Sequence, residues 1–212
     1  MAQNIEAKAK EISIDRSERM DREKYRQEVA QEKEKMEQLK KTPAPASGSG
    51  LISDFEDDKI RANFGAGWAI SSDRIVGRNS TAKMELVKEG AGGSQGSLRL
   101  SGEVAKGGAM AWAGVMFFPG TTIMAPANLS SYQGIHFWLK GTERQYAVVF
   151  FAQHAGFVPA YSRIFKAGPK WQEFSFSFKD MGLEAYDVTG IFIGAYQESG
   201  AFWFQLDNVR LK

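Results

Sequence analysis

Short apolar or alternating segments follow one another from Leu51 to Lys212, separated by Gly, Pro, Asn and Ser. The interruptions recur about every 8 to 15 residues, a rhythm typical of β-sandwiches and barrels. No segment of this region has the roughly 3.6-residue period of an amphipathic helix. The pattern therefore predicts one all-β domain over residues 51–212, a two-sheet β-sandwich of the jelly-roll type. We expect its strands near residues 51–56, 67–72, 81–88, 97–103, 110–118, 133–140, 145–153, 160–166, 171–178, 188–196 and 201–211.

Two of these segments predict where the core lies, because successive side chains of a strand point to opposite faces of the sheet. Phe174, Phe176 and Phe178 share one face of their segment and oppose polar residues, so we expect them in the core. The segment 145–153 is apolar on both faces, which is typical of a strand covered on both sides. We therefore expect that segment in the middle of a sheet.

The sequence before the sandwich predicts a separate unit. Residues 1–42 form a charged segment, which lacks Gly and Pro between Asp15 and Lys41. Asp15 followed by Glu18 matches a capping box and predicts the start of a helix. This helix is interpreted either as a solvated charged helix or as one that docks a partner domain. Residues 43–50 have the Pro, Ala, Gly and Ser composition of a linker.

Charge and cysteine content exclude several classes of protein. The chain has 27 Lys and Arg against 25 Asp and Glu, without a basic run, so neither nucleic acid nor an anionic membrane is expected as a partner. Cysteine is absent, which removes thiol catalysis and disulfide frameworks. No segment approaches the roughly 18 apolar residues of a membrane span, and the N-terminus lacks a signal-peptide pattern. The compartment therefore stays open.

Aromatic and polar residues that alternate with core positions suggest a sugar platform. Sugar rings stack on flat aromatic side chains, while nearby amides, carboxylates and guanidinium groups bond their hydroxyls. The alternative is that these aromatics are covered by loops, by a second copy or by the N-terminal helix. The candidate ligand-binding residues are Trp138, Trp203, His136, Tyr161, Arg163, Glu173 and Gln205.

Catalytic and metal signals are weak. The run Gly92–Gly96 matches the G-x-S-x-G elbow around Ser94, but a strand follows it, so a Gly-rich turn is expected. His136 and His154 are the only histidines and lack zinc-ligand spacing. We expect no enzymatic activity and no catalytic residue. The carboxylates of Asp54, Asp57 and Asp207 could converge on calcium if the first and last strands are adjacent, and a solvated turn with a capping Asp is the alternative.

A set of short motifs in a fixed order gives a family resemblance over nearly all of residues 51–212. The motifs are Ile52-Ser53-Asp54-Phe55-Glu56, Trp68, Asp73, Gly77, Ser80-Thr81, Gly96-Ser97-Leu98, Asn128-Leu129-Ser130, the run from Gly134 to Gly141, Trp171-Gln172-Glu173-Phe174 and Leu206-Asp207-Asn208-Val209. Together they resemble the complex I intermediate-associated protein family. Arg78-Asn79 departs from the second glycine expected after Gly77, so the loop from 73 to 80 is expected to differ.

The resemblance implies a fold and a function. It implies a galactose-binding-like jelly roll, similar to carbohydrate-binding modules, in a family whose mitochondrial members assist complex I assembly. The chain is also similar to C-terminal modules of secreted amidohydrolases. If it belongs to such a fusion, it would lie in the periplasm or outside the cell. We expect a non-enzymatic accessory or assembly module that docks a partner protein or parent catalytic domain through the N-terminal helix. The alternatives are a carbohydrate-binding module or an amidohydrolase accessory domain.

Overall fold

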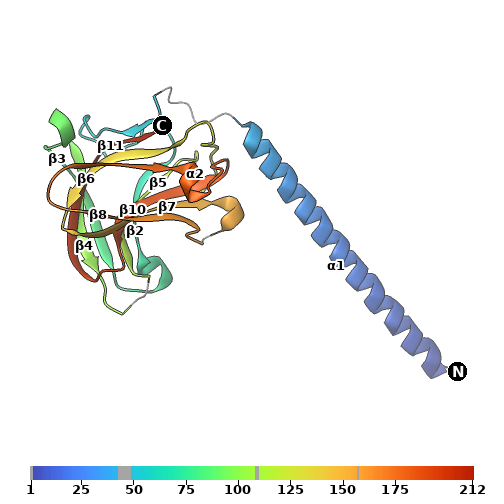
Figure 1. Ribbon diagram of the computed structural model, residues 1–212. Coiled ribbons are helices and arrows are strands. Elements are labelled where there is room, and N and C mark those ends of the chain that lie inside the picture. Colours follow the sequence, from blue (N-terminus) through green and yellow to red (C-terminus); the bar gives the residue numbers. More distant parts are fainter. Residues whose placement is uncertain (1, 43–48, 108–109, 157) are drawn as a thin grey trace. The chain divides into compact units, whose positions relative to one another are not determined.

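The computed structural model describes residues 2–42, 49–107, 110–156 and 158–212. The chain divides into two compact units, Met1–Thr42 and Pro43–Lys212. The first is the helix α1 (Ala2–Lys41), and the second is a β-sandwich (Figure 1). The helix begins at Ala2 and not near Asp15, because nothing in the preceding Ala-, Glu- and Lys-rich sequence interrupts a helix. No helix in the described part of the chain is long and apolar enough to cross a bilayer.

Within the described residues the sandwich has eleven antiparallel strands in two sheets, which confirms the predicted fold class. Sheet A has the order β3 (Thr81–Val87), β4 (Ser97–Val104), β11 (Gly200–Leu211), β6 (Gly134–Gly141) and β9 (Gln172–Ser177), with β1 (Leu51–Ser53) paired to β11. Sheet B has the order β2 (Gly67–Ser72), β5 (Trp112–Phe118), β10 (Val188–Tyr196), β7 (Arg144–Ala152) and β8 (Tyr161–Ala167).

Short helical turns occupy four connections in the part of the body that the structure describes. They are η1 (Asp73–Val76), η2 (Ala91–Gly93), η3 (Gln153–Ala155) and α2 (Phe178–Met181). Each predicted strand is present, and its ends differ from the predicted ends by a few residues. The first strand stops at Ser53 because Phe55 and Asp58 adopt positive φ values of 57° and 58°, which end the extended backbone.

The core lies between the two sheets and is rich in aromatic side chains. Phe137 and Phe204 from sheet A meet Phe117 and Phe150 from sheet B, and all four are fully buried. Phe178 is buried as predicted, although it opens α2 and does not end β9. The other two predicted phenylalanines, Phe174 and Phe176, are partly buried against this core.

The sandwich is held together by its central strands. β11 and β10 are the third strands of sheets A and B, and β7 lies between β10 and β8, in agreement with the expected interior position of residues 145–153. The body begins at Gly50, whose carbonyl accepts a 2.8 Å hydrogen bond from the Leu211 amide. Residues 43–48 of the predicted linker lie outside the described residues.

Candidate functional site

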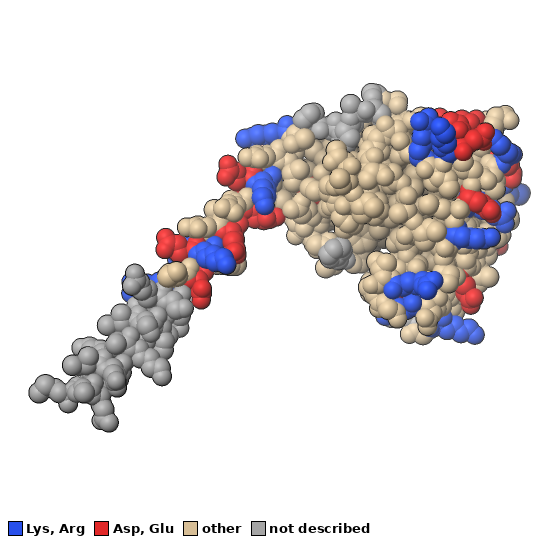
Figure 2. Space-filling model, turned by 180° about the vertical axis from the view of Figure 1, so that it is seen from behind, with Lys and Arg blue, Asp and Glu red and all other residues tan. Residues whose placement is uncertain are grey.

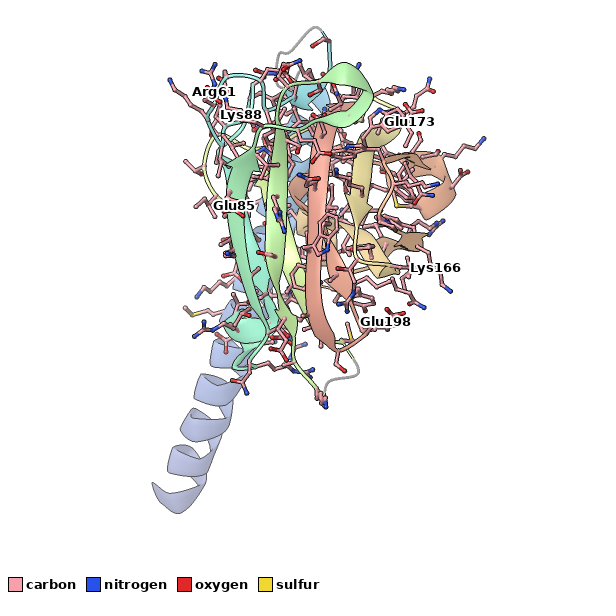
Figure 3. The ribbon with its side chains drawn as sticks, turned by 90° about the vertical axis from the view of Figure 1, so that its left-hand side faces the viewer. Arg61, Glu85, Lys88, Lys166, Glu173 and Glu198 are labelled. Carbon is pink, nitrogen blue, oxygen red and sulfur yellow. The ribbon has the colours of Figure 1, made fainter. Side chains whose placement is uncertain are left out.

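The outward side chains of sheet A form a polar face. In register across four neighbouring strands lie Glu85 on β3, Arg99 on β4, Gln205 on β11 and Lys140 on β6. They alternate with core residues such as Leu206, so they point away from the core. Figure 3 looks onto this face, with Glu85 near one edge and Glu173 near the other. We call this surface the polar face.

Two tryptophans of the polar face are each paired with a cation. The guanidinium carbon of Arg99 lies 5.4 Å from the ring centre of Trp203, and the ammonium of Lys140 lies 5.0 Å from that of Trp171. Glu85 lies 4.0 Å from the Nε atom of Arg99. Trp171, directly before β9, was not among the predicted ligand-binding residues, because its position beside Lys140 depends on strand pairing.

The connection between β3 and β4 folds back over the polar face. Its Glu89 forms an ion pair with Lys140, which lowers the pKa of that glutamate. The Ala91 amide donates a 2.7 Å hydrogen bond to Asp207, whose side chain is completely buried. Burial raises the pKa of Asp207, although hydrogen bonds from Ala91, Ser94 and Asn208 oppose the rise.

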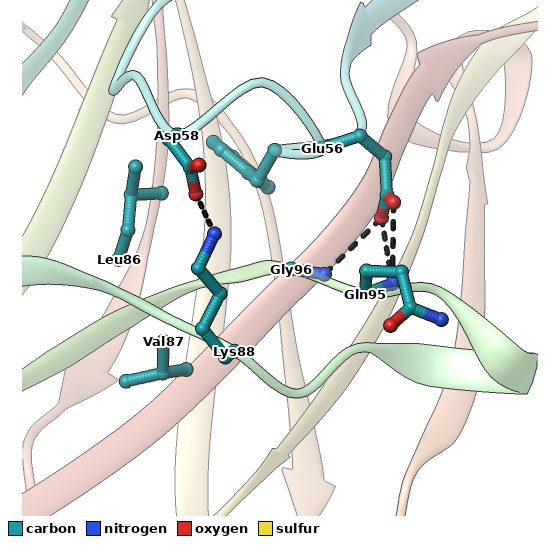
Figure 4. A pocket seen from close by; sticks show the side chains of 8 residues that line it. Glu56, Asp58, Leu86, Val87, Lys88, Gln95 and Gly96 are labelled. Carbon is teal, nitrogen blue, oxygen red and sulfur yellow. Dashed lines mark hydrogen bonds and ion pairs between the residues drawn. The ribbon is translucent and has the colours of Figure 1, made fainter.

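Glu56 fixes the far side of this connection. Its carboxylate accepts hydrogen bonds from the Ser94 hydroxyl, from the Gln95 amide at 3.0 Å and from the Gly96 amide at 3.2 Å. The bond from Ser94, helped by those from the two amides, lowers the pKa of Glu56. Figure 4 shows the bonds from the Gln95 and Gly96 amides beside a small pocket, with Lys88 paired to Asp58 on its other side.

The Gly-rich turn and the three predicted calcium ligands lie on three different segments of the body. Ser94 follows the η2 turn and precedes β4, so the Gly-rich turn is confirmed. Asp57 forms an ion pair with Arg61, and Asp54 accepts a 3.4 Å hydrogen bond from the Glu56 amide. Asp207 lies separately under Ala91. Among the described residues, no three His, Asp or Glu side chains are placed to hold a metal ion.

Five of the seven predicted ligand-binding residues lie on the polar face. Trp203 and Gln205 are on β11, and Trp138 on β6 pairs with Glu173 on β9. The fifth, His136, is buried and bonds through Nε2 to the Glu173 carboxylate, while Lys212 donates to its Nδ1 at 3.2 Å. His136 and Glu173 are therefore engaged with each other.

The other two predicted residues, Tyr161 and Arg163, do not lie on the polar face. Both are on β8, which pairs with β7 at the edge of sheet B, and they share the inward side of that strand with Phe165. Arg163 donates to the Asp180 carbonyl of α2 and to the Ser162 carbonyl. The expectation of one common face is wrong for these two, because local alternation does not reveal which sheet a strand joins.

Tyr161 instead ends a chain of hydrogen bonds that leads through His154 to the buried Asp187. Its hydroxyl lies 2.7 Å from Nε2 of His154, whose Nδ1 lies 2.8 Å from the carboxylate of Asp187. Asp187 is fully buried and also accepts a 2.8 Å bond from the His154 amide. A neutral imidazole can donate to the carboxylate through Nδ1 and accept from the phenol through Nε2. This series of hydrogen bonds holds η3 against the start of β10.

The outward side of sheet B is apolar. Ala147, Val149 and Phe192 form a buried cluster separate from the main core, with Trp112, Met116, Phe151 and Tyr196 packed around it. Of the outward residues on these five fully described strands, Lys166 near the end of β8 alone carries a charge. We call this surface the apolar face.

A row of small residues crosses the apolar face. Ser71, Gly114, Gly194 and Ala147 lie in register on four adjacent strands. Side chains from the neighbouring rows lie down over this row: a Cβ built on Gly194 would be 2.5 Å from the ring of Phe192. The result is a flattened apolar surface with few hydrogen-bonding groups.

Exposed apolar side chains of the body gather around sheet B. Among the described residues, each exposed large hydrophobic side chain of the sandwich lies on a sheet B strand or in a connection directly before or after one. Figure 2 shows a broad area without charges, while charged residues gather on the side of the body that carries sheet A. The exposed residues are Ile70, Ile75, Val76, Met110, Ile123, Met124, Val158 and Ile164.

Several solved structures share this architecture. A family 11 carbohydrate-binding module of a Clostridium thermocellum cellulosomal cellulase has a TM-score of 0.54 and 17% identity over 78% of this chain and 95% of the module. A family 30 carbohydrate-binding module has 0.51 and 12%, over 77% and 87%. An exo-β-agarase has 0.52 and 15%, over 77% of this chain and 25% of the enzyme. At these identities the likeness shows the fold alone, a jelly roll.

The sequence gives the family. A comparison with curated protein sequences gave no match. Residues 54–186, more than half of the chain, match the profile described as Complex I intermediate-associated protein 30. The chain belongs to this family. The predicted resemblance is therefore confirmed.

The Complex I intermediate-associated protein 30 match ends before the domain does. It excludes β10 and β11, which are the middle strands of the two sheets, so the folded domain must continue to Leu211. The loop from 73 to 80, where Arg78-Asn79 departs from the family pattern, is fixed by Asp73. This buried carboxylate accepts bonds from the Ser80 amide at 2.9 Å and the Ser80 hydroxyl at 2.8 Å.

Proposed function

We propose that this chain is a non-catalytic docking module, which binds a partner protein through the apolar face. The observation that carries the proposal is the apolar outward side of sheet B, on which Ile164 is half exposed, together with the exposed apolar side chains in the connections around that sheet. Soluble domains rarely expose contiguous apolar surface unless it forms an interface. Burying each such side chain in an interface gains about 1.5–3 kcal/mol when burial is complete.

The chemistry of the face specifies its partner. The central strands present aromatic and aliphatic side chains, and Trp112 donates its indole N–H within the face, to Ser71 at 3.3 Å. A glycan or a charged peptide would find few hydrogen-bonding groups there. An uncharged, apolar protein surface fits, because neither side would bury an unpaired charge.

The family description supports the same kind of function. Its name describes proteins associated with an intermediate of complex I, and association of that kind requires a docking surface. The solved neighbours include two binding modules of the same fold. The N-terminal helix stays a second predicted route to a partner. In that helix Met20, Tyr25 and Val29 are exposed among the described side chains.

A photo-crosslinking experiment tests the proposal. Benzoylphenylalanine is placed at position 164 on β8 or at position 85 on β3. These are exposed positions on edge strands of opposite sheets. In the source cells, we expect a covalent adduct with a defined protein from position 164 and none from position 85. Mass spectrometry identifies the adduct.

The identified protein is then purified and titrated against matched variants. Ile164→Asp places a charge on the apolar face and is expected to weaken binding by about tenfold or more, which is about 1.4 kcal/mol. Glu85→Ala, on the polar face, is expected to bind as tightly as the unchanged chain. Equal affinity for Ile164→Asp, or adducts from position 85 alone, would show that the apolar face is not the docking site.

A further inference from the structure

The polar face carries charged and hydrogen-bonding side chains that have no part in the proposed protein docking. Its row of Glu85, Arg99, Gln205 and Lys140 crosses four strands without a core residue between them. The strands hold these groups on a rigid backbone, and a rigid site binds with little loss of conformational entropy. A sheet face that combines indole rings with fixed hydrogen-bonding groups is suited to a ligand that is apolar on one side and polar around its rim.

Three basic side chains of the polar face each contact a carboxylate. The contacts are Arg99 with Glu85 at 4.0 Å, Lys140 with Glu89, and His136 with Glu173. An anionic polymer would need cations that are not already neutralised by carboxylates. A neutral ligand that can both donate and accept hydrogen bonds matches such pairs. Hydroxyl groups do both.

Trp203 lies on β11, two residues from Gln205 of this row, and Trp171 directly precedes β9 and lies beside Lys140 of the row. The guanidinium of Arg99 lies over the Trp203 ring and the ammonium of Lys140 over the Trp171 ring, so one face of each ring carries a hydrogen-bonding cation and a sugar would stack on the other face. From the strand spacing and the rise per residue, the two ring positions are about 12 Å apart. One extended ligand that crosses β11, β6 and β9 can therefore reach both rings.

We propose that the polar face binds a neutral polysaccharide chain. Its sugar rings stack on Trp203 and Trp171, and its hydroxyl groups bond to the side chains of Arg99, Glu85 and Glu89. The latter three are accessible, with 41%, 53% and 60% of their side chains exposed. The proposal concerns the opposite sheet from the apolar face and does not depend on the docking of a protein.

The geometry also changes the platform that the sequence suggests. Trp138 pairs with Asp207, and the η2 turn covers Asp207 through the Ala91 amide. The turn therefore lies over the sheet next to Trp138. The platform predicted from the sequence, by contrast, includes both Trp138 and Trp203. Trp171 takes the place of Trp138 as the second stacking ring of the proposed site.

Affinity electrophoresis of the full chain tests the proposal. Native gels contain mixed-linkage β-1,3-1,4-glucan, xylan or galactomannan as neutral polymers, or polygalacturonate as an anionic one. We expect retardation by at least one neutral polymer. Trp203→Ala and Arg99→Gln are each expected to weaken this binding about tenfold or more, and Trp203→Phe is expected to restore part of it. Far-ultraviolet circular dichroism checks that each variant is folded, and Arg99→Gln alters only a partly exposed side chain.

Ile164→Asp is the matched control from the apolar face, and we expect it to keep full retardation. This separates the two proposals, because loss of protein docking and loss of sugar binding then follow different substitutions. No retardation by any neutral polymer overturns the proposal. Retardation by polygalacturonate alone, or neutral binding that survives both Trp203→Ala and Arg99→Gln, overturns it as well.

Discussion

At the scale of single residues, Asp207 shows how the covering of the polar face affects ionisation. Its carboxyl group is buried under the η2 turn, and burial raises its pKa above the usual value of about 3.9. The folded state therefore binds a proton more readily than the unfolded state. The contribution of Asp207 to stability is largest below the usual pKa and falls as pH rises through the raised pKa.

Asp207→Asn removes this titration and keeps an oxygen that can accept from Ala91. As pH falls from 7 to 4, we expect the unfolding free energy of the unchanged chain to rise relative to that of Asp207→Asn. Urea unfolding at several pH values measures the difference between the two. A difference that stays constant, or that shrinks toward pH 4, would contradict the assigned shift.

Glu56 has the opposite pH dependence. Hydrogen bonds from Ser94 and from the amides of Gln95 and Gly96 lower its pKa, so its contribution is present above the usual glutamate value of about 4.3 and is lost as pH falls through the lowered pKa. Glu56→Gln removes the charge, and we expect faster amide hydrogen exchange in residues 88–96 at pH 7. The control is Glu103→Gln at the other end of β4. Unchanged exchange in Glu56→Gln would rule out Glu56 as the anchor of this connection.

At the scale of elements, the flat apolar face depends on the small residues of its central row. A Cβ on Gly114 would lie 2.4 Å from the Ile193 carbonyl oxygen and 2.5 Å from the Cα of Gly194, so the strands would have to move apart. We expect Gly114→Ala to cost about 1–3 kcal/mol in urea unfolding. Gly168→Ala is the control, because the space around that glycine is open. Equal stability of the two variants would show that the row tolerates side chains.

The strands could be predicted from the sequence, and their pairing could not. The alternation of Phe174 and Phe176 with polar residues is a local signal, and β9 forms where that signal predicts it. Which sheet a strand joins depends on contacts far along the chain. Tyr161 and Arg163 have the side chains of a sugar platform, but β8 pairs with β7 in the other sheet. Trp171 was not predicted as a ligand-binding residue, because its position beside Lys140 also depends on strand pairing.

The apolar face was missed because its residues resemble core residues. Phe192 is outward and Ile193 is inward on β10, and both are apolar, so their order contains no polar alternation that would mark a surface. The apolar character of β7 on both sides was the one signal in the sequence. It predicted a covered strand, and the cover on the outer side consists of the neighbouring side chains of the same face.

At the scale of the whole molecule, the two units should be separable. The main core runs from Ile52 to Leu211 and includes none of the α1 side chains whose burial the structure describes. Deletion of residues 1–48 is therefore expected to leave the urea midpoint and the m-value of the sandwich unchanged, since m follows the surface exposed on unfolding. A lower midpoint would show that the N-terminal unit stabilises the sandwich.

The same deletion decides between the two routes to a protein partner. If the apolar face docks the partner, the shortened chain binds it with unchanged affinity, and Ile164→Asp weakens binding equally in both lengths. If α1 is the docking element, the deletion alone abolishes binding and Ile164→Asp has no effect in the full chain. The retardation of the protein in polysaccharide gels should be unaffected by the deletion in either case, because Trp203 and Trp171 lie within the sandwich. Isothermal titration measures the affinity of both chain lengths for the purified partner protein that crosslinking identifies.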